Sequence, residues 1–162
     1  MRIRYIRDED FSNYKKISML IGMGVCDWKC CEEANIPVSV CQNSELARVP
    51  EIDYPIEEIF KRYINNHITK SIVLGGLEPL LRKDDVLELI KYFRDNQCED
   101  DIVIYTGYYQ TEVETFITDL LNLHVKNIYI KFGRYVPELP SHKDDILGVQ
   151  LISSNQYGIQ IC

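Results

Sequence analysis

Short apolar runs, several of them ending in glycine, alternate along the chain with segments whose apolar residues recur at helical spacing. Runs of this length bounded by turn residues are typical of buried strands, so we predict strands at residues 16–24, 70–76 and 101–107. Residues 126–133 and 147–153 are two further strand candidates. Strands of this composition indicate a sheet that helices cover.

Three helices are predicted between the strands. In residues 55–67, Pro55 suits a first helical turn. In residues 83–96, acidic residues occupy the first turn, where they stabilise the start of a helix. Thr111 and Glu114 form a candidate capping box for the third helix. The apolar positions that define the buried faces are, in chain order, Ile56, Ile59, Phe60, Tyr63, Ile64, Val86, Leu87, Ile90, Phe93, Val113, Phe116, Ile117, Leu120 and Leu121.

The alternation of strands and helices predicts an α/β fold with a mostly parallel sheet. A chain of 162 residues, 46% of them hydrophobic, can bury one sizeable core. No linker, repeat or low-complexity stretch divides the sequence, so we expect a single domain over residues 1–162.

The charge balance excludes some classes of function. The chain has 18 basic and 25 acidic residues, a net charge of −7, and no basic stripe that would favour binding to nucleic acid. Residues 1–16 are too charged for a signal peptide, and no apolar run approaches the roughly 20 residues of a membrane span. We therefore expect a cytoplasmic protein, in which clustered cysteines stay reduced and indicate metal ligands or redox groups.

Four of the six cysteines lie in residues 23–43, a loop that begins where the first predicted strand ends. The adjacent Cys30 and Cys31 are poorly suited to one metal, because successive side chains diverge. Omitting Cys31 leaves Cys26-x3-Cys30-x10-Cys41, a set of three thiolates, one fewer than saturates a cluster of four irons. This spacing favours an iron–sulfur cluster with an open iron over a zinc site or unligated thiols.

Unusual loops also follow the other predicted strands. They are GGLEPL at residues 75–80, TGYY at 106–109 and SSNQ at 153–156. Each of them alone is an ordinary turn. Ligands collect at the carboxyl ends of the strands in parallel sheets, so four such loops at one edge predict a ligand site.

With these motifs in this order, the sequence resembles the radical S-adenosylmethionine (SAM) enzymes, and within them the small activating proteins of anaerobic ribonucleotide reductase. The cluster motif Cys-x3-Cys-x2-Cys, with Asn following, is matched by CDWKC at residues 26–30 and CQN at 41–43, although the last spacer has ten residues instead of two. The Gly-Gly-Glu-Pro motif is matched by GGLEPL, with Leu77 inserted. YTGY, FGRYV (without the family's aspartate) and SSNQ resemble further motifs, so the resemblance spans residues 16–157.

The resemblance implies that Cys26, Cys30 and Cys41 hold a 4Fe–4S cluster whose open iron binds SAM. The implied SAM-binding residues are Gly75, Gly76, Glu78, Thr106, Ser154, Asn155 and Gln156. In this interpretation the paired glycines admit the methionine moiety and Glu78 accepts a hydrogen bond from its ammonium. Thr106 binds the ribose, and the SSNQ loop lines the nucleoside. No catalytic residue beyond the cluster and SAM is predicted.

The resemblance also implies a fold and a partner. Because a complete (β/α) barrel takes about 250 residues, this chain is expected to form a partial, open barrel of the radical SAM type. The implied activity is that of an oxidoreductase that cleaves SAM with an electron from flavodoxin or ferredoxin. The resulting 5′-deoxyadenosyl radical would take hydrogen from a glycine of the large subunit of the anaerobic ribonucleotide reductase.

Two alternative functions stay open at this point. The first is a small radical SAM enzyme that acts on a metabolite, similar to the 7-carboxy-7-deazaguanine synthases. The second is a non-catalytic, metal-binding interaction module. The activating protein is favoured because YTGY, FGRY and SSNQ are not part of the general SAM motif, and because an open barrel suits a protein substrate.

Overall fold

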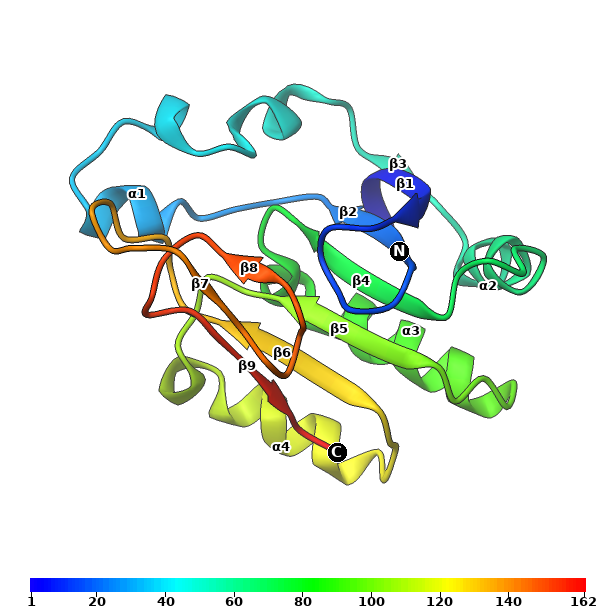
Figure 1. Cartoon of the computed structure of the whole chain (residues 1–162). Helices are drawn as coiled ribbons and strands as arrows, with labels where there is room; N and C mark the ends of the chain where they lie inside the picture. Colours follow the sequence, from blue (N-terminus) through cyan, green and yellow to red (C-terminus); the bar gives the residue numbers. More distant parts are fainter.

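The computed structural model describes residues 1–162. One sheet contains, in spatial order, β3 (Ile52–Asp53), β1 (Arg2–Asp10), β2 (Ser18–Met23), β4 (Ser71–Gly76), β5 (Asp101–Tyr105), β6 (Ile128–Phe132) and β9 (Tyr157–Gln160). The four central strands, from β2 to β6, are parallel, as the sequence predicts (Figure 1). The outer pairings on both sides of them are antiparallel, so the sheet is mixed.

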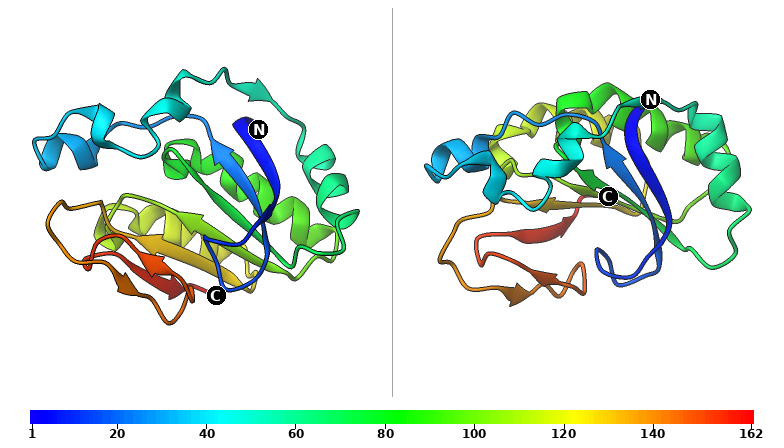
Figure 2. Two further views of the ribbon diagram at one scale, coloured as in Figure 1. Left: turned by 45° about the horizontal axis from the view of Figure 1, so that its top comes forward. Right: turned by 90° about the horizontal axis from the view of Figure 1, so that it is seen from above.

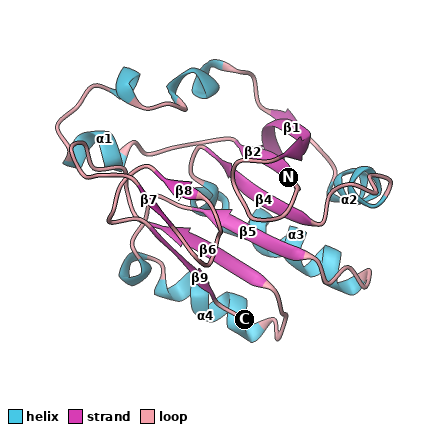
Figure 3. Cartoon of the chain, viewed as in Figure 1, coloured by secondary structure: helices cyan, strands magenta, loops and turns pink.

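Three helices cover one face of the sheet: α2 (Ile56–Ile64), α3 (Lys83–Asp95) and α4 (Glu114–Asn122) (Figure 3). They confirm the three predicted helices. The loops contain a further short helix, α1 (Lys29–Glu33), and the 3-10 turns η1 (Val38–Val40), η2 (Ser44–Arg48), η3 (Pro79–Arg82) and η4 (Gln110–Glu112). None of the helices combines the length and the apolar character that crossing a bilayer requires.

The predicted cap of the third helix is wrong. Thr111 lies inside η4, and α4 begins only at Glu114, after an N-cap at Val113. The carboxylate of Glu112 reaches back to accept a hydrogen bond from the Tyr109 N–H at 2.8 Å. The turn is therefore capped two residues earlier than the sequence pattern indicated.

The strand predictions also need correction at the two ends of the chain. Neither β1 nor β9 was predicted as a strand. Of the candidate strand at residues 147–153, only β8 (Gln150–Leu151) forms, and it pairs with β7 (His142–Lys143) in a separate hairpin. The place beside β6 is taken by β9, so the SSNQ loop precedes the last strand of the sheet instead of following it.

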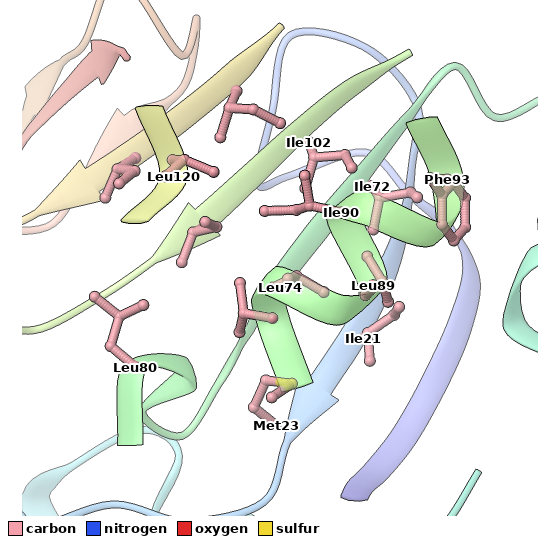
Figure 4. Close-up of a cluster of buried hydrophobic side chains, with 14 of the residues drawn as sticks. Ile21, Met23, Ile72, Leu74, Leu80, Leu89, Ile90, Phe93, Ile102 and Leu120 are labelled. Atoms are coloured by element: carbon pink, nitrogen blue, oxygen red, sulfur yellow. The ribbon is translucent and has the colours of Figure 1, made fainter. Parts of the chain in front are cut away.

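The main core lies between the sheet and the helices (Figure 4). Alternate residues of a strand face the same side, so β2, β4 and β5 each present a fully buried isoleucine to it, namely Ile21, Ile72 and Ile102. Phe93 of α3 belongs to the same core and meets Phe60 of α2 edge-on, with ring centroids 5.0 Å apart. Burial of apolar side chains on this side stabilises the sheet and fixes the positions at which its strands end.

The opposite face of the sheet is covered only in part. The segment that contains the β7–β8 hairpin lies against it (Figure 2), and Leu147 and Leu151 form a smaller core with Tyr14, Leu20 and Val73. The last two of these lie in the first half of β2 and β4. The amino-terminal half of this face is therefore filled by the protein itself.

The sheet is open, with β3 and β9 at its two edges. An α/β architecture with parallel central strands is thus established. The partial barrel stays a prediction, and so does the assignment of residues 1–162 to a single domain.

The core makes a direct prediction for stability. Phe93 is fully buried between α2 and the sheet, whereas Phe11 is 68% exposed. We expect Phe93→Ala to lower the free energy of unfolding by about 3–5 kcal/mol, because it removes a buried ring and leaves a cavity. Phe11→Ala, the matched control, should change it by less than about 0.5 kcal/mol. Chemical denaturation measures both, and equal effects would contradict the assigned core.

Candidate functional site

A cavity of about 680 Å³ lies at the carboxyl ends of the central strands. Figure 1 places α1, which carries two of the cysteines, beyond these strand ends. The residues predicted from the sequence that line the cavity are Cys26, Cys30, Cys41, Gly75, Gly76, Glu78, Thr106 and Gln156. Ser154 and Asn155 do not line it. All four predicted loops therefore contribute to one site, although not every predicted residue does.

The cysteine loop is anchored where it leaves the sheet and again where it returns. The Arg4 guanidinium of β1 donates to the Gly24 carbonyl, with Nε at 2.8 Å, and also to the Val49 carbonyl. Between these points the chain turns sharply at Trp28, which has a left-handed backbone (φ 60°) just before α1. The loop is thereby held at the ends of the central strands.

The three predicted cysteine ligands are free, half-buried thiols. Burial raises the pKa of Cys26 to about 12, although the Trp28 N–H donates to its sulfur at 3.4 Å. Burial likewise raises the pKa of Cys30 to about 11 and that of Cys41 above its usual range. Negative charge on Cys30 adds to the increase at both of the others, so the three thiols share one electrostatic environment.

The donor set is that of an iron–sulfur cluster. Cys26, Cys30 and Cys41 line one cavity and supply the soft thiolate ligands that such clusters use. In a cluster of four irons each thiolate binds a different iron, so its ligands stand farther apart than those of one ion. The fourth cysteine, Cys31, is 3% exposed and also lines the cavity, and its sulfur lies 3.9 Å from that of Cys30, so the expectation that these two side chains diverge is wrong.

The two glycines at the end of β4 serve different purposes. Gly76 has φ +86°, and a Cβ there would lie 3.1 Å from the Gly22 Cα, so backbone geometry alone requires glycine. A Cβ on Gly75 would meet nothing closer than the Tyr105 Cβ at 3.5 Å, which is an ordinary contact. Gly75 is therefore a position where a side chain would enter the cavity without disturbing the protein around it.

Glu78 joins two of the strand-end loops. Its carboxylate is 6% exposed and accepts hydrogen bonds from the Leu80 N–H at 3.0 Å, the Thr106 hydroxyl at 2.8 Å and the Gly107 N–H at 2.8 Å. Burial raises the pKa of Glu78, and these three donors oppose the increase. The Thr106 hydroxyl also accepts from the Tyr108 N–H at 3.0 Å, so both groups are already engaged within the protein.

In the SSNQ loop, only Gln156 reaches the cavity. Its side-chain amide is buried and donates to the Gly133 carbonyl at 3.2 Å. Ser154 is exposed. Asn155 donates to the Arg134 carbonyl at 2.9 Å, which places it behind the cavity wall. Ser153, which was not predicted, is fully buried and ties this loop to the Val136 backbone.

Sequence reasoning also missed Arg134, which links α1 to the strand ends. Its guanidinium, 3% exposed, donates to both carboxylate oxygens of Glu112 at 2.6 Å and lies 3.0 Å from Glu33 of α1. These hydrogen bonds lower the pKa of Glu112 to about 2. Lys29 pairs with Glu112 at 3.2 Å, and the Tyr108 hydroxyl donates to Asp27 at 2.6 Å. The only sequence signal was a single arginine in FGRYV.

Comparison with known proteins gives one finding. A family model described as a 4Fe-4S single cluster domain matches residues 19–156. The matched segment runs from β2 to the end of the SSNQ loop and includes the cysteine loop and the loops at 75–80, 106–109 and 153–156, all of which line the cavity. No curated protein and no solved structure gives a significant match to the chain.

The two glycines generate a paired prediction. Gly76→Ala should lower the free energy of unfolding by about 1–3 kcal/mol, because alanine is strained at this φ. Gly75→Ala should leave stability unchanged or raise it by up to about 1 kcal/mol, since alanine restricts the unfolded chain. Its methyl group should nevertheless obstruct binding in the cavity, which calorimetric titration with SAM would measure. Equal destabilisation by both variants would contradict the assigned geometry.

Proposed function

The chain belongs to the 4Fe-4S single cluster domain family, and from this premise we propose that it is a radical SAM activating enzyme. The observation that carries the proposal is the convergence of three thiols, an open glycine position and a buried glutamate on one cavity at the ends of parallel strands. Cys26, Cys30 and Cys41 would hold the cluster. Thiolates are the usual ligands of such clusters, and three of them leave one iron open.

The SAM molecule is proposed to lie along the ends of β4, β5 and β6. Gly75 lines the cavity without a side chain of its own, which would let the methionine moiety approach the backbone of β4 closely. Glu78 fixes Thr106 and Gly107 at the next strand end and is itself one of the residues that line the cavity. Gln156 lines the far wall in the proposed nucleoside region.

The protein would position the cofactors, enclose them and exclude solvent from the reaction. When bound, the cluster would supply the electron that cleaves SAM to methionine and a 5′-deoxyadenosyl radical, the chemistry that belongs to the cofactor. The protein holds the cysteine loop against the strand ends through Arg134, Glu112 and Lys29. The small core around Leu147 and Leu151 keeps solvent from the amino-terminal end of the cavity.

The proposed substrate is a glycine in the large subunit of an anaerobic ribonucleotide reductase, with flavodoxin or ferredoxin as the electron donor. The order of the YTGY, FGRYV and SSNQ motifs supports this choice over a metabolite. So does the exposed insertion in the cysteine loop, where Val38 and Val40 are 39% and 52% exposed. A docked reductase would cover this exposed part of the cysteine loop while the radical is present.

The first test concerns the cluster ligands. Cys26→Ala, Cys30→Ala and Cys41→Ala should each lose most of the iron after anaerobic reconstitution, because each removes one of only three ligands. Cys31→Ala and the distant Cys98→Ala should retain it. Iron analysis and visible absorption measure the outcome. Stoichiometric zinc without iron in the wild-type protein would instead favour the non-catalytic module.

The second test concerns the reaction. The reconstituted protein alone should release 5′-deoxyadenosine slowly and without a coupled product. With the reductase from the same genome and reduced flavodoxin, an EPR doublet from a glycyl radical should appear. A reductase whose radical-site glycine is replaced by alanine is the control. If no radical forms while a nucleoside or another metabolite gives a coupled product, the metabolite enzyme replaces the activating enzyme.

A further inference from the structure

Lys131 places a positive charge near the carboxyl end of the buried strand β6. Alternate side chains of a strand point to opposite faces. Ile130 and Phe132 accordingly belong to the core under the helices, whereas Lys131 lines the cavity on the other face. The lysine is 7% exposed, although the rest of the strand is apolar or aromatic.

The ammonium of Lys131 has hydrogen-bond acceptors but no counter-ion. It donates to the Gly133 carbonyl at 2.8 Å and to the Thr106 carbonyl at 3.5 Å. Its distance to the centroid of the Tyr105 ring is 6.0 Å, at the limit of a cation–π contact. Backbone carbonyls satisfy N–H groups, but they do not neutralise a full positive charge.

The other two cations that line the cavity are already paired. Arg7 is 59% exposed and lies 3.3 Å from Asp10. Arg134 is neutralised by Glu112 and Glu33. Lys131 is thus the one buried cation of the cavity wall that forms no ion pair.

A buried charge that has no counter-ion within the protein destabilises the fold. Burial lowers the pKa of Lys131 to about 8, against the opposing attraction of negative charge at Glu78 and Cys30. An apolar residue of similar length would fit the strand without this penalty, since unpaired buried charges destabilise and apolar replacements relieve them. The cost becomes understandable if the cavity takes up an anion when it is filled.

We propose that Lys131 is the anion-binding residue of this cavity and that its ammonium provides the counter-charge for a negatively charged ligand group. That group is either the carboxylate of an amino-acid-type ligand or the anionic assembly of cluster and cysteine thiolates. The identity of the anion rests on the proposed function, whereas the existence of an unpaired charge awaiting one does not.

The apoprotein provides the first test, which needs neither iron nor SAM. If Lys131 is an uncompensated charge, Lys131→Met should be as resistant to chemical denaturation as the wild type, or more so. Lys126→Met, at an exposed lysine just before the same strand, is the matched control and should have no effect. A clear loss of stability in Lys131→Met alone would show that the lysine only ties β5 to β6 and would overturn the inference.

The loaded protein then distinguishes the two anions. If the anion is a carboxylate, Lys131→Met should bind SAM about ten- to a hundredfold more weakly, with decarboxylated SAM unaffected. If it is the cluster assembly, SAM affinity should hold, while an EPR redox titration should give a lower midpoint potential, because a lost positive charge disfavours the added electron. In the first case Lys131→Arg should restore most of the SAM affinity, and in the second case most of the midpoint potential.

Two results separate this inference from the proposed function. Failure of the wild-type protein to take up iron or SAM would end the proposed function, and the apoprotein comparison would still decide whether the charge is uncompensated. Normal SAM affinity and an unchanged midpoint potential in Lys131→Met would overturn the inference while leaving the activating enzyme intact.

Discussion

Glu78 lies in the loop after β4, but two of the three hydrogen bonds to its carboxylate come from the loop after β5. A carboxylate that is 6% exposed would be strongly destabilising without these donors. Its burial therefore holds the two loops at a fixed separation. The cavity wall at Gly107 depends directly on this contact, and Gly75, at the end of β4, adjoins the loop that Glu78 holds. The rest of the site is built around that frame.

Charged contacts define the other walls as well. Arg134 connects the segment after β6 to η4 through Glu112 and to the cysteine helix through Glu33. Apolar side chains packed at this position would fill the space at native density and leave no cavity. Directional contacts between charged groups fix the loops at their outer edges, around a central cavity of about 680 Å³. Opposite charges thus serve here to keep a volume open as well as to stabilise the fold.

The sequence pattern was sufficient for the parts of the fold that bury continuous apolar runs, namely the parallel strands and their helices. It failed for β1, whose alternating charged residues suggested only a polar terminus, and for the four-residue β9. The cysteine set and GGLEPL were placed correctly at one edge because parallel strands end together. Lys131 and Arg134 were missed because their importance lies in their burial, which the sequence does not reveal for a single charged residue.

The covered face of the sheet also constrains how the cavity fills. Leu147 and Leu151 pack against Leu20 and Val73, so the protein itself closes the amino-terminal end of the cavity. In the proposed reaction, SAM and the substrate would therefore both enter at the strand ends, beside the cysteine loop. In the proposed reaction SAM takes the deeper position against Gly75, and the substrate binds last, over it. An activating enzyme gains from this order, because cleavage of SAM is productive only after the reductase covers the opening.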